Sequence, residues 1–568
     1  MRIVLGAEGR STGHLGGYAA FMRALRLLAS TLALAYTAAD EVFTRGSRLG
    51  GPISLRVSGV HLSPSGSRIG SRLDDGIVAA GNVSTRKTSV RDHVDRPAID
   101  RRSYFLVLIG GGSLVQALLA ALILLYVNFP AGYNVAYGLS LDSVALFRTL
   151  WPYPTLSLPA DTFRMLAIAN ILALWAVYGA SWLWVHRHKP AVSRRSIAFV
   201  IVAFALLFNG VLALLMPPVL SLDIYNYALY GRMFGLHGLN PYVTAGGAVA
   251  GDPFLAFAGW QERGTVYGPA WTLISSGAAA LASQSVLSAV LVFKCLEAFF
   301  SLANCVLVLL LARHFTAHAV GPLLLYAWNP LILIETAGSG HNEAAMVTFA
   351  LLGLLLVVRG RLLTGLVVLV VSVLVKYATG LLLILVVARQ LAEERAWRER
   401  AAKAGLMAII VVLLVAGLYF PFWPGAERVG WLLVGSSPML NSMQNVVGLA
   451  LRAALEGLLA VLPFARDQAT LDAYVVWGLN AVFGLLVLAF VRTVAHQGVG
   501  WLRVLELWGL ATLTYVVLIY AGAFPWYLVS PIAIASTVSW TAVGRRLALW
   551  SCGIGMAMML LYAMPITG

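Results

Sequence analysis

The chain alternates long apolar runs with short polar connections. Most of the runs reach the roughly 20 residues that are needed to cross about 30 Å of hydrocarbon. One run, 361–388, is interrupted by Lys376 and Tyr377, and the piece 269–284 is too short to span. The other runs are 104–127, 163–186, 196–219, 286–313, 317–337, 341–358, 404–422, 473–492, 504–523, 526–541 and 545–565. This pattern predicts an all-α polytopic membrane protein with about 13 helices.

Composition supports a membrane protein. Of the 568 residues, 60% are hydrophobic and 11% are charged, which is more apolar surface than a soluble domain can bury. The net charge of +16 does not indicate nucleic acid, because Lys and Arg fall between the apolar runs and in the first hundred residues. The three cysteines, Cys295, Cys305 and Cys552, lie inside apolar runs and have neither metal nor disulfide spacing.

Residues 1–102 differ from the rest of the chain. They contain 15 Lys or Arg against 8 Asp or Glu, and their best apolar piece, Tyr18–Tyr36, is interrupted by Arg23 and Arg26. We expect a basic, disordered tail without an assigned function. Either a cytosolic tail or an extension beyond the true start of the protein accounts for it. Residues 103–568 are expected to form a single transmembrane domain.

The short basic connections set the expected orientation in the plasma membrane. They are Arg101–Arg102, 187–195, Arg313, 359–361, 389–403, Arg492 and Arg545–Arg546. Placing all of them in the cytoplasm puts the N-terminus inside. The loops expected on the outer side are 128–162, 220–268, 338–340, 423–472 and 524–525. The run 361–388 must then enter and return as two short helices that meet at Lys376 and Tyr377.

With this orientation, stretches rich in polar, aromatic and proline residues collect on the outer side. They are DIYNY at 223–227, NPY at 240–242, YGP at 267–269, GSGHNE at 338–343, PFWP at 421–424 and FPWY at 524–527. Connections without a function have no reason to collect such residues on one face. The pattern therefore predicts a reaction site at the outer, extracytoplasmic face of the membrane.

Asp223 is the candidate general base of this site. It follows the Pro217–Pro218 pair at the mouth of a predicted helix, close in sequence to Tyr225 and Tyr227. A carboxylate beside the membrane has a perturbable proton affinity, and a general base needs a free oxygen within reach of the acceptor hydroxyl. The alternatives are a solvated carboxylate at a helix end and an N-cap.

Lys376 is the most informative cation. A lysine inside an apolar run costs several kcal/mol unless it is paired or hydrated. We interpret it as an ammonium that binds a phosphate as a point charge, against the alternative of a snorkelling or structural lysine. Arg232 is a second candidate for a phosphate or a sugar, with an interfacial anchor as the alternative.

Other candidates would contact sugars. His341, Asn342 and Glu343 open a predicted helix, where His and Asn side chains can hydrogen-bond hydroxyls; capping and a first-turn acid are the alternatives. The aromatic planes of Tyr267 and of Trp526 with Tyr527 can bind sugar faces, although Trp and Tyr also gather at membrane interfaces.

The acids Asp223, Asp252, Glu262 and Glu343 lack the spacing of metal-binding loops, so no metal or other cofactor is expected.

Taken in order, these motifs resemble a known family. The order is Asp-x-Tyr-x-Tyr with a following Tyr-Gly-Arg, Asn-Pro-Tyr, Asp-Pro, Tyr-Gly-Pro, Asn-Pro with a downstream His-Asn-acid, an intramembrane Lys and Pro-Trp-Tyr. Over roughly 104–565 the chain resembles the polyprenol-phosphate-mannose-dependent α-1,6-mannopyranosyltransferases of actinobacterial lipomannan synthesis and their relatives in the GT-C superfamily.

The resemblance implies a GT-C fold and an inverting transfer of a sugar from a polyprenyl phosphate to a hydroxyl of a glycan or glycolipid. It implies that Asp223 is the base and that Lys376, with Arg232, holds the donor phosphate. Sugar or acceptor contacts are expected from Tyr225, Tyr227, Asn240, Tyr242, Tyr267, His341, Asn342, Glu343, Trp526 and Tyr527. The family acid after His-Asn is often Asp, whereas this chain has Glu343.

Two alternatives stay open on sequence alone. The donor sugar could be another one, such as arabinofuranose or glucose, because no motif specifies it. A transporter or flippase also uses intramembrane lysines and broken helices, but it usually shows a repeated half, and none is visible here. The sequence does not specify the oligomeric state.

Overall fold

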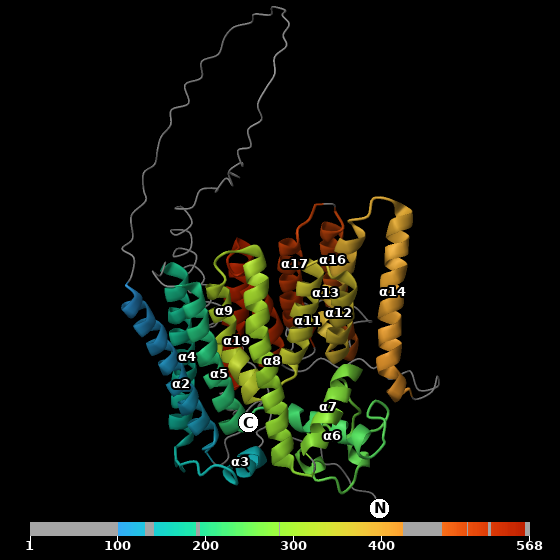
Figure 1. Cartoon of the computed structure of the whole chain (residues 1–568). Coiled ribbons are helices and arrows are strands. Elements are labelled where there is room, and N and C mark those ends of the chain that lie inside the picture. Colours follow the sequence, from blue (N-terminus) through green and yellow to red (C-terminus); the bar gives the residue numbers. More distant parts are fainter. Residues whose placement is uncertain are drawn as a thin grey trace, which may run out of the picture. The chain divides into compact units, whose positions relative to one another are not determined.

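In a computed structural model of the chain, the structure describes residues 100–130, 141–188, 193–282, 284–423, 468–496, 498–520 and 524–562. All of them lie within Ala98–Gly568, which belongs to one structural unit. The described residues form helices and contain no strand, which confirms the all-helical prediction for this part of the chain (Figure 1).

Seven helical segments are long and apolar enough to cross a membrane. They are α2 (Arg101–Tyr126), α4 (Ala160–Arg187), α5 (Arg194–Leu215), α8 (Val286–Phe315), α14 (Trp397–Tyr419) with η5 (Phe420–Phe422), the Ala473–Val494 part of α16 (Gln468–Val494), and α17 (Trp501–Thr514) with η8 (Tyr515–Ile519). An eighth is formed by α9 (Val320–Ala327) and the Pro330–Gly338 segment, if these two pieces, bent by 49°, are one span.

The remaining helices are shorter or less apolar. They are α3 (Leu141–Arg148), α6 (Asp223–Gly235), η1 (Gly246–Ala248), η2 (Leu255–Phe257), α7 (Pro269–Ala282), α10 (Pro330–Leu333), the π-helical turn η3 (Ile334–Gly338), α11 (Glu343–Val358), α12 (Leu362–Val375), η4 (Tyr377–Thr379), α13 (Gly380–Leu391), η9 (Pro525–Leu528), α18 (Val529–Val538) and α19 (Ala542–Tyr562). The described residues thus hold seven or eight candidate spans, and the expectation of about 13 is not confirmed.

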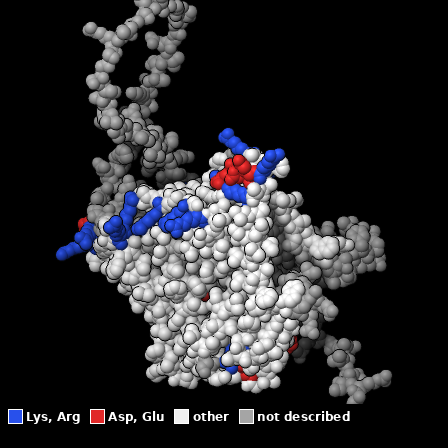
Figure 2. Space-filling model, turned by 45° about the vertical axis from the view of Figure 1, so that its right-hand side comes forward, with Lys and Arg blue, Asp and Glu red and all other residues white. Residues whose placement is uncertain are grey.

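Basic residues mark one end of the helices. Arg187 ends α4, Arg194 begins α5, Arg313 lies in the last turn of α8, and Arg359 follows α11. Figure 2 shows Lys and Arg gathered along one rim, next to a broad band of uncharged surface. This is the distribution expected of a membrane protein with one strongly basic face.

The opposite end holds α3, α6 and α7 (Figure 1). α5 ends before the Pro217–Pro218 pair, and α6 begins at Asp223, packs against α7 and is buried over the residues 223–233. Proline supplies no backbone N–H and hinders continuation of a helix, which explains why the chain turns here. A polar, aromatic helix is therefore enclosed by other helices at this end.

The interruption predicted at Lys376 is confirmed. α12 ends at Val375, Lys376 has an extended backbone with φ −153° and ψ 127°, and η4 begins at Tyr377. The break lies beside the start of α7, where the Gly268 N–H donates to the Val375 carbonyl at 3.2 Å. Irregular backbone in an apolar protein requires such partners.

Two expectations fall outside the described residues. Residues 1–99, which make up nearly all of the predicted tail, are not described, and neither are the residues 424–467 of the predicted outer loop 423–472.

Gly268→Ala is predicted to destabilise the protein. A Cβ at this position would lie 2.0 Å from the Leu374 carbonyl oxygen, so α7 and α12 would have to separate. We expect a loss of roughly 1–3 kcal/mol, measured as a lower midpoint of thermal unfolding in detergent. Gly277→Ala in α7 is the control, because its Cβ would meet nothing within 4 Å. Equal midpoints for both variants would contradict the close approach.

Candidate active site

Asp223 is the first residue of α6 and is not its N-cap. Leu222 holds the cap position, and no side chain in the described part of the chain caps this helix. The Asp223 carboxylate accepts no hydrogen bond from the described residues, and its side chain is 12% exposed. Its Oδ2 lies 3.6 Å from His341 Nδ1. A carboxylate with free lone pairs and a small opening is able to accept a proton from a bound molecule.

His341 reaches Asp223 because the chain turns sharply between η3 and α11. Gly340 makes this turn with φ +78°, and a Cβ there would lie 2.5 Å from Ile224 Cδ1. The turn directs His341 back over η3, where its Nε2 lies 3.4 Å from Glu335 Oε2. The imidazole is therefore placed between two carboxylates from different elements.

Glu343 and Lys376 form an ion pair next to this group. Glu343 is the first residue of α11 and its side chain is 1% exposed, while the Lys376 side chain is 13% exposed. Lys376 Nζ also lies 4.9 Å from the centre of the Tyr527 ring, and its charge interacts with that of Asp223. The structure thus brings together Asp223, His341, Glu343 and Lys376, four residues that the sequence analysis singled out from distant segments.

Aromatic side chains enclose this cluster. The Trp526 ring stacks on His341 with centroids 4.0 Å apart, and Tyr527 stacks on Tyr520 at 3.7 Å. On the α6 side, the Tyr227 ring meets Tyr267 edge-on at 4.8 Å. The Tyr227 hydroxyl donates to Asn342 Oδ1 at 3.5 Å. These residues form apolar walls with a few polar atoms, the usual composition of a small-molecule site.

Three other predicted sugar contacts have different partners. Asn240 Nδ2 donates to the Phe422 carbonyl at 2.6 Å, and the Tyr242 hydroxyl donates to the Tyr267 carbonyl at 2.8 Å. The Tyr225 hydroxyl lies 2.6 Å from Ser143 Oγ in α3. Asn240 and Tyr242 therefore support the wall around Tyr267, whereas Tyr225 lies toward α3.

Arg232 is not brought to the cluster. Its Nε donates to both carboxylate oxygens of Asp252, at 2.9 and 3.1 Å, its Nη2 donates to Gln284, and its guanidinium covers the Phe254 ring. Arg232 is 2% exposed, and the Asp252 side chain is fully buried. This bidentate pair joins α6 to the segment that follows η1.

Burial opposes ionisation of Asp252, but hydrogen bonds from His237, the Phe254 N–H and Arg232 lower its pKa below 3.8. The pair therefore stabilises the fold fully above that pH, and the contribution is lost as the pH falls through the lowered pKa.

Three charged residues of this region were missed in the sequence analysis. Glu335 lies in the apolar run 317–337, and Lys294 and Glu297 lie in the run 286–313. Each interrupts an apolar run as Lys376 does. The presence of a charged residue inside an apolar run, which singled out Lys376, therefore also identifies these three. Lys294 donates to the Met216 carbonyl, and Glu297 Oε2 accepts from the Ala345 N–H at 3.3 Å.

Several buried polar atoms near the start of α11 have no hydrogen-bond partner within the described residues. They are both ring nitrogens of His341, Asn342 Nδ2, Glu343 Oε2 and Glu297 Oε1. Buried polar atoms are normally satisfied, so a group of unsatisfied ones points to a molecule that binds here. No group of three or more His, Cys, Asp or Glu side chains in the described residues has the geometry of a metal site.

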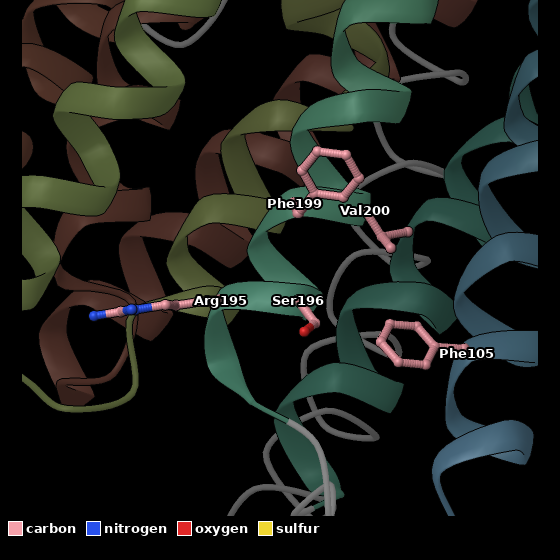
Figure 3. Close-up of a pocket in the computed structure, with 5 residues that line it drawn as sticks. All are labelled: Phe105, Arg195, Ser196, Phe199 and Val200. Atoms are coloured by element: carbon pink, nitrogen blue, oxygen red, sulfur yellow. The ribbon is translucent and has the colours of Figure 1, made fainter.

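A surface cavity of about 530 Å³ lies elsewhere, between the starts of α2 and α5. Figure 3 shows Phe105 of α2 facing the α5 residues Ser196 and Val200, with Arg195 pointing away from them. None of its lining residues belongs to the cluster around Asp223. We therefore base the active site on the cluster and not on this cavity.

Comparison with known proteins identifies the chain's relatives. The family model described as "Alpha-(1->6)-mannopyranosyltransferase, N-terminal domain" matches residues 103–392. That range contains Asp223, His341 and Lys376, and ends before Trp526 and Tyr527.

Alpha-(1->6)-mannopyranosyltransferase A of Mycobacterium tuberculosis is 27% identical over 419 residues, 70% of this chain and 76% of the relative. The protein of the same name from Corynebacterium glutamicum is 30% identical over 172 residues, 30% of this chain and 35% of its own. No solved structure matches the chain. Since the family model spans about half of the chain, this membrane protein is a glycosyltransferase that belongs to the alpha-(1->6)-mannopyranosyltransferase family.

Proposed function

We propose that the chain transfers a mannosyl residue from a polyprenyl-phosphate-mannose donor to a hydroxyl of a glycan or glycolipid on the outer face of the membrane. The names of its relatives support mannosyl transfer. The observation that carries the proposed site is geometric: Asp223 of α6 lies beside His341, and Lys376, at the break after α12, pairs with Glu343, two residues after His341, among aromatic side chains.

In the proposed reaction, Asp223 removes the proton of the acceptor hydroxyl while that oxygen attacks the anomeric carbon. The bond from this carbon to the phosphate oxygen breaks, and its electron pair stays on the phosphate. Attack from the face opposite to the leaving group inverts the configuration. Asp223 suits the role of base because its carboxylate accepts no hydrogen bond from the described residues and is partly open.

Lys376 is proposed to hold the donor phosphate. The Lys376 side chain is the more exposed member of the pair with Glu343, at 13% against 1%, so it is the member that faces a bound donor in this proposal. The negative charge on the leaving phosphate grows as the bond breaks, and a fixed cation stabilises that charge. We do not include Arg232 in the donor site, because Asp252 already matches its charge.

Sugar contacts are proposed for the polar atoms that surround this pair. Asn342 Nδ2 and Glu343 Oε2 have no hydrogen-bond partner among the residues that the structure describes, and sugar hydroxyls both donate and accept hydrogen bonds. Tyr227, Tyr267, Trp526 and Tyr527 offer aromatic surface. The identity of the donor sugar is tested by the comparison of mannose, arabinofuranose and glucose donors described below.

Asp223→Asn is predicted to abolish turnover. The amide has the same shape and accepts no proton, and no cap hydrogen bond is lost, so stability should be unchanged while transfer falls by about 100-fold or more. The assay measures label passing from radiolabelled polyprenyl-phosphate-mannose to a mannosyl glycolipid in membranes that contain the protein. Asp142→Asn, an exposed acid in α3, is the matched control.

Two outcomes would contradict parts of this proposal. An active Asp223→Asn variant would remove Asp223 as the base. A folded wild type that is silent with the mannose donor would exclude that donor, and arabinofuranose and glucose donors would then be compared in the same assay.

Lys376 is best tested without leaving Glu343 unpaired, because an orphaned buried carboxylate costs about 3–5 kcal/mol. We therefore compare Lys376→Met/Glu343→Gln with Glu343→Gln alone. The donor KM of the double variant should be about 10–100-fold higher than that of Glu343→Gln alone. This is the effect of losing a charge-assisted hydrogen bond of about 1.5–3 kcal/mol. Equal donor KM values for the two variants would show that Lys376 does not bind the phosphate.

Arg232→Met separates a structural role from a donor-binding role. Loss of the guanidinium leaves buried Asp252 with His237 and the Phe254 N–H but without the arginine charge, so we expect a loss of about 3–5 kcal/mol in unfolding free energy and an unchanged donor KM. The double variant Arg232→Met/Asp252→Leu should recover part of the stability. A normal thermal midpoint together with a raised donor KM would instead place Arg232 at the phosphate.

A further inference from the structure

His341 occupies a position between two acids. Its Nδ1 lies 3.6 Å from Asp223 Oδ2, and its Nε2 lies 3.4 Å from Glu335 Oε2. Both distances are longer than a normal hydrogen bond, and such bonds often shorten only when substrate is bound. The Glu335 side chain is 5% exposed and that of His341 is 1% exposed, so solvent does not separate these groups.

The ring is fixed in this position. Trp526 stacks on one face with an interplanar angle of 19°. The His341 N–H donates to the Glu335 carbonyl at 3.0 Å, so backbone and side chain of Glu335 both face the same histidine. The π-helical turn η3 presents Glu335 to this position. Because the ring is held in this way, its two nitrogens face different carboxylates, Nδ1 that of Asp223 and Nε2 that of Glu335.

Hydrogen counting limits how this group can be protonated. Two ionised carboxylates offer only acceptors, and a neutral imidazole carries only one N–H. Both contacts can be hydrogen bonds if the His341–Glu335 pair holds one additional proton. In that state the N–H on Nδ1 points to Asp223 Oδ2, whether the proton resides on Nε2 or on Glu335.

We propose that His341, supported by Glu335, is the positioning residue of Asp223: it donates from Nδ1 to Oδ2 and so leaves Oδ1 to receive the proton of the acceptor. This inference rests on the proposed function, because it assumes that Asp223 is the base. It assigns to His341 a role other than sugar binding, and it gives Glu335 a role in the reaction.

A pH dependence follows from the proton count. As the pH rises and the pair loses its additional proton, one N–H remains for two carboxylates; when that proton is on Nε2, at the shorter contact with Glu335, the lone pair of Nδ1 faces the Asp223 carboxylate. The two groups repel each other, and transfer should fall. Other charged or titratable groups around the cluster are the same in every variant below: Glu297, Glu343, Lys294, Lys376, Tyr227, Tyr230, Tyr267, Tyr520 and Tyr527.

Two conservative variants keep an N–H group that donates to Asp223 but remove the His341–Glu335 pair that shares the additional proton. His341→Asn places an amide N–H near the position of Nδ1. In Glu335→Gln, an amide N–H donates to Nε2 and so keeps the only ring proton on Nδ1. Both should retain kcat within about 10-fold of the wild type and lose the alkaline fall in the profile of kcat against pH.

Two further variants serve as comparisons. His341→Leu, which has no donor, should lose about 10–100-fold in kcat with little change in the donor KM. Thr336→Val is the control for η3, because it removes only a hydrogen bond to the Ile332 carbonyl and should keep the wild-type profile. An alkaline fall that persists in both His341→Asn and Glu335→Gln would overturn the proposal.

A second measurement does not depend on activity. Nitrogen-15 NMR of histidine-labelled protein identifies the His341 signals by their absence in His341→Asn. In the wild type these signals should change with pH over the range of the alkaline fall, and in Glu335→Gln they should remain those of a neutral ring protonated on Nδ1. Wild-type signals that show Nδ1 without a proton at neutral pH would overturn the positioning role.

The two proposals fail in different ways. If Asp223→Asn abolishes transfer and the His341 and Glu335 variants keep the wild-type pH profile, only the positioning role is wrong. If the wild type does not use polyprenyl-phosphate-mannose, the donor is wrong, and the NMR signals still decide whether His341 donates to Asp223.

Discussion

The need to compensate charge inside an apolar bundle controls the arrangement of this protein. Glu343, His341 and Glu335 are almost fully buried, and a charge in that position is tolerated only with a partner. The partners come from four places: α6, η3, the start of α11 and the break after α12. Because removing one member leaves another uncompensated, the positions of these four segments depend on one another.

The irregular backbone of the bundle serves this requirement. α12 stops at Val375, and Lys376, with its extended backbone at this break, pairs with Glu343. A π-helical turn and the left-handed backbone of Gly340 likewise bring Glu335 and His341 together. Such interruptions occur where protein groups satisfy the freed backbone. Gly268 shows this directly, because its N–H donates to the carbonyl at the end of α12.

The sequence predicted those features that depend on local pattern and on membrane sidedness. Polarity inside an apolar run located the break at Lys376, and the collection of motifs on one face indicated that Asp223, His341, Glu343 and Lys376 belong together. Pairings between segments could not be predicted in the same way. Arg232 was interpreted as a phosphate ligand because nothing in a single sequence shows that Asp252, 20 residues away, accepts both of its hydrogen bonds. The expected number of about 13 transmembrane helices is not confirmed, because several apolar runs within the described residues form short or bent helices.

The cluster repeats one arrangement twice. Asp223 and Lys376, with side chains 12% and 13% exposed, are each backed by a partner of opposite character that is 1% exposed, His341 and Glu343 respectively. The outer member of each pair is the more exposed one, and the inner member lies directly against it. A transfer from a phosphate to a hydroxyl requires a proton acceptor and a cation held at a constant separation, since catalysis by fixed charges depends on their not having to reorganise. Because Glu343 follows His341 by two residues, the backing groups of both pairs belong to the same turn, and in the proposed reaction that turn sets the distance between Asp223 and Lys376.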